Sequence, residues 1–500
     1  MSRLLIAAVL TYIAICLYMG LSLTGLQYDE AIYEHGAVAL ITGDASPDFA
    51  RDGFPLMVIS YAGAAKFYLL AIPFAVFGTA PAVGRVVSML LGALGIFGIG
   101  RAVQLQAGDS AGAAVAFALA IHPEYVSWTL YDNSGAALWM ANCGLVALAL
   151  SRFLQRRDRF SALLLGAASG FAVWGRMNFL WILAGLAIAS MIVFHWRPRF
   201  AAALAAGFAA GAAPLIVYEL ATRFRTFRTP ATANAFVLFR TRLEYASSAL
   251  LYDGERAAMW GGAAPPYWQT IACGAVVVLA GIVLFLSKSR DRIVLIGRWA
   301  VIAAAVAYAL AFLTPLGVNA HHFAALLPLP AIVVCLAAAV LCRHGRIARA
   351  AVVLLAAAYA IASLEWNRAA HAGLAATHGV GMWSDAIAGV SRSLEQQRRE
   401  VAIVDWGLAN NLYVLTRARV PFRELFWRAD VPWNERVSRG GLFLLNAPAN
   451  THFARSAAAF LRALQETHAA YSVTTFRQHD GAEYARLYDV RPQSLPLHAH

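Results

Sequence analysis

The chain has 500 residues, of which 60% are hydrophobic and 13% are charged. Soluble domains carry about 25% charged residues, so this composition excludes an ordinary soluble protein and favours one embedded in a lipid bilayer. The formal net charge of +13 does not indicate nucleic-acid binding, because the basic residues form short clusters between apolar segments, as in cytoplasmic loops. These clusters are Arg152–Arg159, Arg197–Arg199, Lys288–Arg292 and Arg343–Arg349.

Apolar segments of spanning length follow one another as far as about residue 365. A helix needs about 20 apolar residues to cross the hydrocarbon core of a bilayer, and the first segment has no cleavage site of a signal peptide. We therefore expect an all-α membrane domain over residues 1–365 with about eleven transmembrane helices. The predicted spans are 4–24, 86–104, 110–122, 133–151, 160–175, 178–195, 200–222, 268–287, 293–313, 322–342 and 349–365.

One further apolar stretch, Phe67–Gly78, decides the orientation. At about 12 residues it is too short to span, and a crossing here would move the basic clusters to the outer side. We predict that it lies on the membrane or re-enters it. The N-terminus is then cytoplasmic. Residues 25–85 form a large periplasmic loop with one or two interfacial helices, and residues 223–267 form a second large loop on that side.

Residues 366–500 have the composition of a soluble tail, and the parity of the spans predicts that it is periplasmic. Val401–Val404 and Leu442–Leu445 have the pattern of buried strands, and Ala457–Glu466 has that of an amphipathic helix. We expect a small α/β domain outside the membrane. The five cysteines have no metal-ligand spacing, and we expect no disulfide framework.

Acidic residues are scarce, so those beside the predicted spans stand out. Asp29 and Glu30 follow the first span directly, where a carboxylate can be partly desolvated and act as a general base. A hydrated pair that only flanks the span is the alternative. Asp132 lies between two spans on the same side, where it could face Asp29 across a cleft. Asp132 or Asn133 could instead cap the next helix.

Basic residues are predicted on this outer side as well. Arg176 lies in a short turn, and an interfacial arginine usually has a partner, although it can also snorkel and cap a helix. His321 and His322 stand at the outer start of a span. Adjacent residues of a helix point about 100° apart, so a metal here would need other ligands. Contact with a phosphate, or simple placement at the interface, is the preferred interpretation.

Carboxylates and cations at one membrane face suit chemistry on an anionic lipid head group. Lys66, Arg85 and Arg176 would hold a phosphate leaving group. A carboxylate would take the proton of an acceptor hydroxyl. The pattern predicts transfer of a group from a lipid phosphate.

Four motifs in the first 200 residues carry a family resemblance, and a later segment, Ala320-His321-His322 to Leu327-Pro328, fits it. The motifs are the pair Asp29-Glu30; Gly53 to Lys66 with Phe77-Gly78 and Arg85; His122-Pro123-Glu124-Tyr125 leading to Asp132; and Gly170 to Phe179 around Arg176. In this order the chain resembles the GT-C class of membrane glycosyltransferases, which use polyprenyl- or dolichyl-phosphate sugars. Within that class it resembles the protein O-mannosyltransferases and the aminoarabinose transferases (glycosyltransferase family 39).

The resemblance implies roles for these residues. Asp29 would be the catalytic base, and Glu30 would support it. Lys66, Arg85, Arg176 and His321 or His322 would contact the lipid phosphate or the sugar, and Asp132 would contact substrate. Leu130-Tyr131 replaces an arginine that often precedes Asp132 in relatives, which puts the acceptor contacts in doubt.

The resemblance also implies partners and a location. The donor would be a polyprenyl-phosphate sugar, and the acceptor an envelope glycan, lipid or protein at the periplasmic face of the inner membrane. No motif fixes a cofactor, and a divalent metal stays open. A transporter or lipid flippase is the competing class, but it would carry ionisable residues near the bilayer midplane and often inverted repeats. A non-catalytic scaffold built around the tail is a third interpretation.

Overall fold

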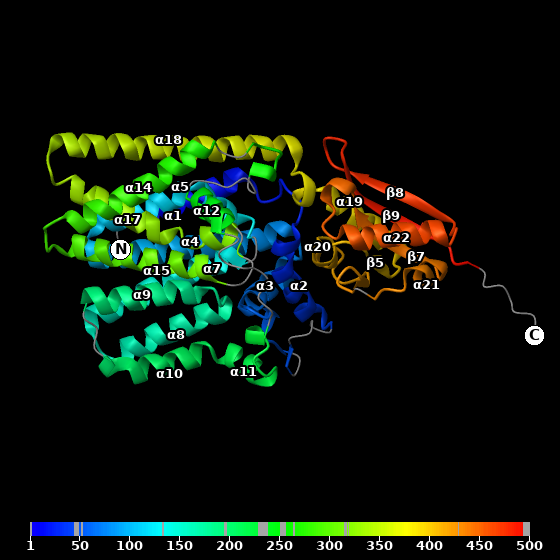
Figure 1. Cartoon of the computed structure of the whole chain (residues 1–500), viewed down its shortest axis with the longest axis horizontal. Helices are drawn as coiled ribbons and strands as arrows, with labels where there is room; N and C mark the ends of the chain where they lie inside the picture. Colours follow the sequence, from blue (N-terminus) through cyan, green and yellow to red (C-terminus); the bar gives the residue numbers. More distant parts are fainter. Residues whose placement is uncertain are drawn as a thin grey trace, which may run out of the picture.

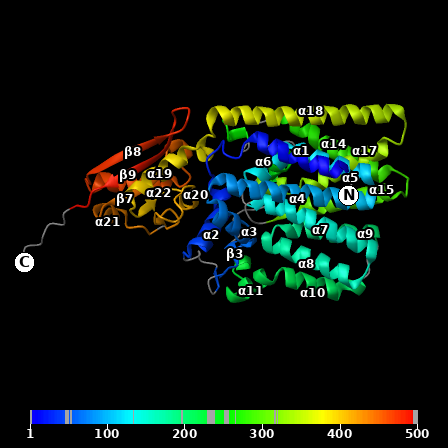
Figure 2. The same ribbon diagram turned by 180° about the vertical axis from the view of Figure 1, so that it is seen from behind.

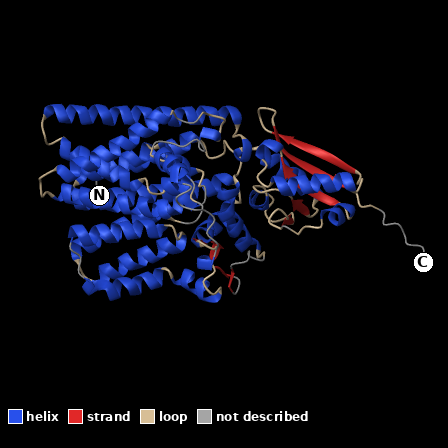
Figure 3. Ribbon diagram, viewed as in Figure 1, coloured by secondary structure: helices blue, strands red, loops and turns tan. Residues whose placement is uncertain are grey.

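The computed structural model consists of a helical bundle and a smaller sheet-containing domain beyond one end of the bundle (Figures 1 and 3). The structure describes residues 3–44, 50–51, 54–132, 135–194, 198–228, 239–250, 257–263, 266–314, 318, 320–428 and 430–493. The long helices run side by side along the bundle. The N-terminal end of the chain lies at the end of the bundle away from the sheet-containing domain (Figures 1 and 2).

A helix lies over each of the predicted spans. Among the described residues, four helices are long and apolar enough by themselves to cross a membrane, and a bent pair makes a fifth when it is taken as one span. The chain is therefore a multi-pass membrane protein, whereas eleven crossings stay a prediction. The four are α4 (Pro81–Ala107), α7 (Ala136–Arg156), α15 (Arg292–Leu313) and α18 (Arg346–Thr377), and the pair is α10 (Ala201–Gly211) with α11 (Ala213–Ala221).

The other predicted spans coincide with shorter helices. They are α1 (Arg3–Met19), α5 (Asp109–Ile121), α8 (Arg159–Gly175), α9 (Phe179–Phe194), α14 (Tyr267–Leu286) and α17 (Pro328–Leu341).

Three spans differ from the predicted ones, two of them at prolines. The single helix expected over 200–222 bends by 68° between α10 and α11, because Pro214 follows Gly211 and cannot donate a backbone hydrogen bond to the preceding turn. The span expected at 322–342 is divided into α16 (Ala320–Ala324) and α17, which begins at Pro328. Helix α18 runs to Thr377 instead of ending near residue 365.

Helices α8 and α10 pack with their backbones in close contact. A Cβ atom added at Gly207 would lie 2.1 Å from the carbonyl oxygen of Leu163, and one at Gly170 would lie 2.1 Å from that of Phe208. Small residues at the contact between two membrane helices let the helices approach each other closely. The α8–α10 pair therefore depends on its glycines.

Gly207→Leu should lower the midpoint of thermal unfolding, since overpacking a close contact typically costs about 1–3 kcal/mol. Gly274→Leu on α14 is the matched control, because a Cβ there meets nothing within 4 Å. The measurement is thermal unfolding of both variants in one detergent. Equal unfolding midpoints for Gly207→Leu and the native protein would show that α8 and α10 can move apart without a loss of stability.

Short elements gather at the end of the bundle next to the sheet-containing domain (Figures 1 and 2). Helix α3 has 13 residues and is about 20 Å long at 1.5 Å per residue, which is less than a bilayer core. The short elements are α2 (Tyr28–Thr42), β1 (Ala50–Arg51), β2 (Phe54–Pro55), β3 (Met57–Ile59), β4 (Ala62–Gly63), α3 (Ala65–Phe77), α6 (Pro123–Leu130) and α12 (Phe239–Ser248).

The C-terminal domain is built on a five-stranded sheet of order β6-β5-β7-β9-β8. Strand β5 is parallel to β6 and β7, and β9 is antiparallel to β7 and β8. The predicted strands at 401–404 and 442–445 and the predicted amphipathic helix are confirmed. The elements are α19 (Ala386–Gln397), β5 (Val401–Ile403), α20 (Ala409–Leu415), β6 (Phe422–Glu424), α21 (Trp433–Ser438), β7 (Gly441–Asn446), α22 (Ala454–Glu466), β8 (Tyr471–Arg477) and β9 (Glu483–Val490).

Helix α20 of this domain packs on α2. The His35 ring stacks on Tyr413 with 3.8 Å between ring centroids, and His35 Nδ1 lies 2.8 Å from Asn410 Oδ1. Asn411 donates a hydrogen bond to the backbone oxygen of Leu26 (3.1 Å). The C-terminal domain therefore holds both the start and the middle of α2, the helix that carries Asp29.

Candidate active site

Helix α2 presents its acidic residues on different faces. Gln27 caps its N-terminal end, and the Gln27 side chain accepts hydrogen bonds from the backbone N–H groups of Asp29 (2.6 Å) and Glu30 (3.1 Å). Residues four apart share a face of a helix, so Asp29 lies with Tyr33, and Glu30 lies with Glu34. Asp29 is half-buried, whereas Glu30 and Glu34 are buried.

Glu30 is committed to an ion pair with Arg85 of α4. The guanidinium donates from Nε to Oε1 (2.7 Å) and from Nη2 to Oε2 (2.9 Å). Its other N–H groups donate to the backbone oxygens of Leu21 (3.0 Å), Thr24 (3.2 Å) and Gly25 (2.8 Å). All five donors of an arginine are thus used on protein atoms. The predicted contact between Arg85 and a lipid phosphate would have to break this arrangement, which we call the Glu30–Arg85 clasp.

Lys66 and Asp132 form a second buried ion pair. Lys66 Nζ also donates to Ser88 Oγ (3.0 Å). The other carboxylate oxygen of Asp132 accepts a hydrogen bond from the backbone N–H of Ala137 in α7 (2.6 Å), so Asp132 both binds a cation and caps a helix. Asn133, the other candidate for the cap, lies outside the described residues.

The Tyr33 ring lies in the middle of the predicted site residues. Lys66 Nζ is 5.6 Å from the ring centroid, and a Cβ at Gly135 would come within 2.7 Å of the phenol oxygen. Burial raises the pKa of Tyr33 to about 12; the positive charge of Arg176 opposes this rise, and the carboxylate of Asp29 adds to it. Lys66 therefore lies beside this ring, and the charges of Asp29 and Arg176, which come from distant segments, both act on its phenol.

Arg176 links the outer loop to the bundle. Its backbone forms a bridge with Ala62 of β4, and its guanidinium lies over the ring of Trp139, 5.5 Å from the centroid. Arg176 Nη2 is 3.2 Å from His322 Nε2. Arg176 therefore lies next to one of the two histidines, while their predicted contact with a lipid phosphate or sugar stays a prediction.

His321 and His322 belong to α16, the short helix before α17. Their rings are 4.0 Å apart between centroids, and His321 also packs on Trp128, at 5.5 Å. In the part of the chain that the structure describes, no group of three or more His, Cys, Asp or Glu side chains is arranged to hold a metal ion.

Sequence reasoning missed Glu34, which lies between the two ion pairs. Burial raises the pKa of its carboxyl, and the neighbouring Glu30 adds to the rise, while Lys66 and Arg85 oppose it. Gly84 of α4 makes room for it, because a Cβ there would overlap the Glu34 carboxylate. The spacing of four between Glu30 and Glu34, which places both carboxyls on one face of the helix, is the signal that could have found it.

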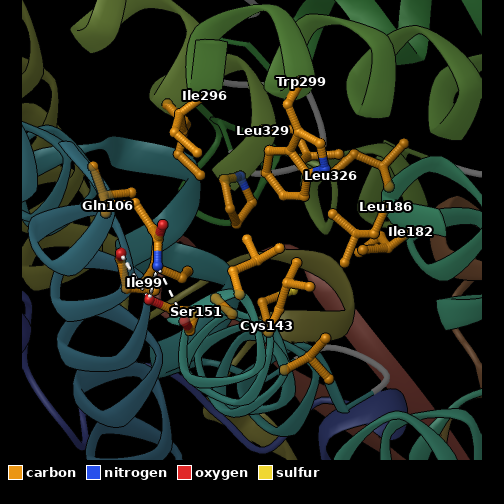
Figure 4. A pocket seen from close by; sticks show the side chains of 18 of the residues that line it. Ile99, Gln106, Cys143, Ser151, Ile182, Leu186, Ile296, Trp299, Leu326 and Leu329 are labelled. Carbon is orange, nitrogen blue, oxygen red and sulfur yellow. Dashed lines mark hydrogen bonds between the residues drawn. The ribbon is translucent and has the colours of Figure 1, made fainter. Parts of the chain in front are cut away.

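An apolar cavity lies within the bundle (Figure 4). Phe179 lines this cavity and packs on Trp139, the residue under the Arg176 guanidinium. Leu326, which also lines the cavity, follows the histidine pair in the chain. Its lining comes from α4 (Ile99, Ala102, Val103, Gln106), α7 (Cys143, Val146, Ala147, Leu150, Ser151, Leu154), α9 (Phe179, Ile182, Leu186), α15 (Ile296, Trp299) and the segment 325–332 (Ala325, Leu326, Pro328, Leu329, Ile332).

Gln106 and Ser151 lie next to each other in the wall of this cavity (Figure 4). Gln106 Nε2 donates to Ser151 Oγ (2.7 Å) (Figure 4), and Arg292 Nη2 donates to Gln106 Oε1 (2.5 Å). The cavity is thus a largely apolar chamber with a closed polar network at Gln106 and Ser151, and its wall residue Phe179 connects it through Trp139 to Arg176.

Known structures share the fold over almost the whole of this chain. The crystal structure of ArnT from Cupriavidus metallidurans bound to undecaprenyl phosphate aligns with a TM-score of 0.61 and 13% identity over 96% of this chain and 97% of that chain, and its apo state aligns equally. The fold is that of the GT-C membrane glycosyltransferases. The apo oligosaccharyltransferase of Archaeoglobus fulgidus aligns with a TM-score of 0.50 and 14% identity over 99% of this chain and 75% of that chain. No protein-family model matches the sequence, and no curated protein matches it.

Proposed function

We propose that this protein transfers a sugar from a polyprenyl-phosphate-linked donor to the hydroxyl of a lipid, glycan or protein acceptor. The observation that carries this proposal is that Arg176, next to His322, lies over the ring of Trp139, which packs on Phe179 in the wall of the apolar cavity. The site around Arg176 and the cavity are therefore neighbours. A ligand that fills both must join an anionic head to an apolar tail. A polyprenyl phosphate has this form, and guanidinium groups bind phosphate oxygens well.

We propose Asp29 as the general base of this transfer. It shares the surroundings of Tyr33 with Arg176, and its partial exposure lets an acceptor approach from the aqueous side. Glu30 and Asp132 are less suited, because each already holds a buried cation. Their proposed role is to keep α2, α3 and α7 in place around the base.

The proposed reaction is a single inverting displacement. The acceptor oxygen forms a bond to the anomeric carbon while the bond between that carbon and the phosphate oxygen breaks. The acceptor proton passes to Asp29, and the bonding electrons leave with the lipid phosphate. Charge that develops on the phosphate is stabilised by cations, so the leaving group needs Arg176 and Lys66 more than it needs an acid. Lys66 can bind the phosphate only when its ammonium group leaves Asp132 and pairs with the phosphate instead.

The test is binding of undecaprenyl phosphate to the purified protein, followed by native mass spectrometry. Loss of one hydrogen bond to a charged group costs about 1.5–3 kcal/mol, so Arg176→Ala should weaken binding by about tenfold or more. Arg225→Ala, on the exposed connection after α11, is the matched control. Equal binding by Arg176→Ala and the native protein would reject the proposed head-group site.

We further propose that the site lies at the periplasmic face of the inner membrane. The connections between α14 and α15 and between α17 and α18, which carry basic clusters, lie at the end of the bundle away from α2 and α3 (Figures 1 and 2). Positively charged loops stay in the cytoplasm, which supports a periplasmic position of α2, α3 and the C-terminal domain.

Reporter fusions test this orientation. Fusions after Arg157, Lys288 and His344 should have cytoplasmic activity, and a fusion after Gln397 should have periplasmic activity, because positive loops are retained inside. Alkaline phosphatase and green fluorescent protein fusions measure the two sides. Cytoplasmic activity of the Gln397 fusion would require α3 to cross the membrane and would place the proposed site inside the cell.

A further inference from the structure

The C-terminal domain carries a cluster of aromatic side chains near Asp29; Trp427 and His452 in it are exposed, Trp406 and Phe453 are partly buried, and Phe426 is buried. Trp427 follows β6 and is 61% exposed. Its ring packs on Phe453 (5.1 Å between centroids), which in turn packs on Phe426 (4.8 Å). Trp406, after β5, packs on the exposed ring of His452 (5.0 Å). We call these five side chains the aromatic rim.

The rim stands at the carboxyl ends of the parallel strands. Trp406 follows β5, and Phe426 and Trp427 follow β6. His452 and Phe453 belong to the connection between β7 and α22. In open sheets with parallel strands, ligands bind outside the carboxyl ends.

Asp405 fixes the geometry of the rim. This fully buried carboxylate accepts hydrogen bonds from the backbone N–H groups of Trp406 (2.9 Å), His452 (3.2 Å) and Phe453 (2.8 Å). Asn446 Nδ2 donates to its other oxygen (3.2 Å). One buried side chain thus ties the ends of β5 and β7 to the connection that carries His452 and Phe453, so the rings are held in advance of any ligand.

Tyr28 connects the rim to the proposed base. Its ring packs on Trp406 (4.7 Å between centroids), and its hydroxyl donates to Glu424 Oε1 (3.1 Å). The other oxygen of Glu424 accepts a hydrogen bond from Trp427 Nε1 (3.0 Å). Because Tyr28 precedes Asp29 in the chain, the ring that packs on Trp406 of the rim lies one residue from the proposed base. The C-terminal domain extends away from the bundle on this side (Figure 1).

We propose that the aromatic rim binds the saccharide part of the acceptor; this rests on the proposed function. A sugar ring has an apolar C–H face and a polar edge. A site for a sugar ring therefore needs rigid aromatic faces with hydrogen-bonding groups between them. Amphipathic aromatic rings beside a few well-placed polar groups are a general feature of ligand-binding sites. Trp406 and Trp427 supply the faces, and Glu424 and His452 supply the polar groups. A buried partner helix would instead need a continuous apolar surface, which the carboxylate of Glu424 interrupts.

The test is binding of the full-length protein in lipid nanodiscs to an array that carries bacterial surface saccharides, hexasaccharides of glucose, mannose and N-acetylglucosamine, and random peptides. The native protein should bind at least one saccharide class. Trp427→Ala should weaken that binding by about fivefold to tenfold, in line with the energy of one aromatic contact. Trp427→Phe, which keeps an aromatic face, should retain most of it. Tyr471→Ala removes a half-exposed ring from β8 and is the matched control.

Undecaprenyl phosphate binding, measured on the same samples, separates this proposal from the proposed function. Three results, each obtained with intact lipid binding, would overturn the acceptor site and leave the donor site standing. They are an absence of saccharide binding, saccharide binding that Trp427→Ala leaves unchanged, and binding to peptides alone. Saccharide binding that depends on Trp427, without lipid binding, would support the rim as a saccharide site and count against the proposed transfer reaction.

Discussion

Asp29→Asn should lower turnover by about 100-fold or more while binding of undecaprenyl phosphate stays within about twofold of the native value. Asparagine keeps the size of the side chain but cannot accept a proton, and general-base catalysis typically contributes about 10²–10⁴-fold. The donor is bound by cations and by the apolar cavity, neither of which this change touches. A loss confined to the chemical step is the signature of an interaction made only in the transition state.

The measurement is transfer from a radiolabelled polyprenyl-phosphate sugar to envelope acceptors in washed membranes, with lipid binding followed separately. Asp44→Asn is the matched control, because Asp44 lies just after α2 and accepts a hydrogen bond from Tyr413 (2.7 Å), which an asparagine oxygen can also accept. Near-normal turnover of Asp29→Asn would remove Asp29 as the base. Glu34, a buried acid on the same helix that the sequence did not single out, would then be the next candidate for study.

The helical layout was predictable because the signal is local. Each span is a run of apolar residues, and a run is visible without knowing what surrounds it. The breaks were harder to predict, since Pro214 and Pro328 can either kink a span or begin a new helix. Only the contacts of the neighbouring helices decide between these outcomes. The interruption at Pro328 matters most here, because it leaves α16 free to bring the histidines to Arg176.

The site was predictable as a set of residues and less so as a set of partners. Topology alone predicted that Asp29, Lys66, Asp132 and Arg176 share one side of the membrane. Which cation meets which carboxylate depends on the rotation of α2 about its axis, and that rotation is set by the packing of α20 on His35 and of Gly84 on Glu34. Neither contact has a signature in the sequence of α2.

Arg85→Met should lower the free energy of unfolding by about 3–5 kcal/mol, the usual cost of removing one partner of a buried ion pair. Arg85 is fully buried and Glu30 is 1% exposed, so the substitution leaves a carboxylate without its cation. It also leaves the backbone oxygens of Leu21, Thr24 and Gly25 without their donor. These oxygens belong to the segment that leads into α2, and its order should be lost first.

A double substitution shows whether the Glu30–Arg85 clasp is the cause. Arg85→Met combined with Glu30→Gln removes the uncompensated charge, so it should be less destabilised than Arg85→Met alone. Arg368→Met is the control, because Arg368 pairs with Glu365 at an exposed site where such pairs contribute about 0–1 kcal/mol. Thermal unfolding in one detergent ranks the variants, and native mass spectrometry at low temperature measures their undecaprenyl phosphate binding.

If Arg85→Met kept its stability and lost lipid binding, the clasp would be secondary, and Arg85 would be a phosphate ligand, as the family resemblance implied. If it lost stability and the remaining folded protein still bound the lipid, Arg85 would act on catalysis only through α2, by holding the helix that presents Asp29.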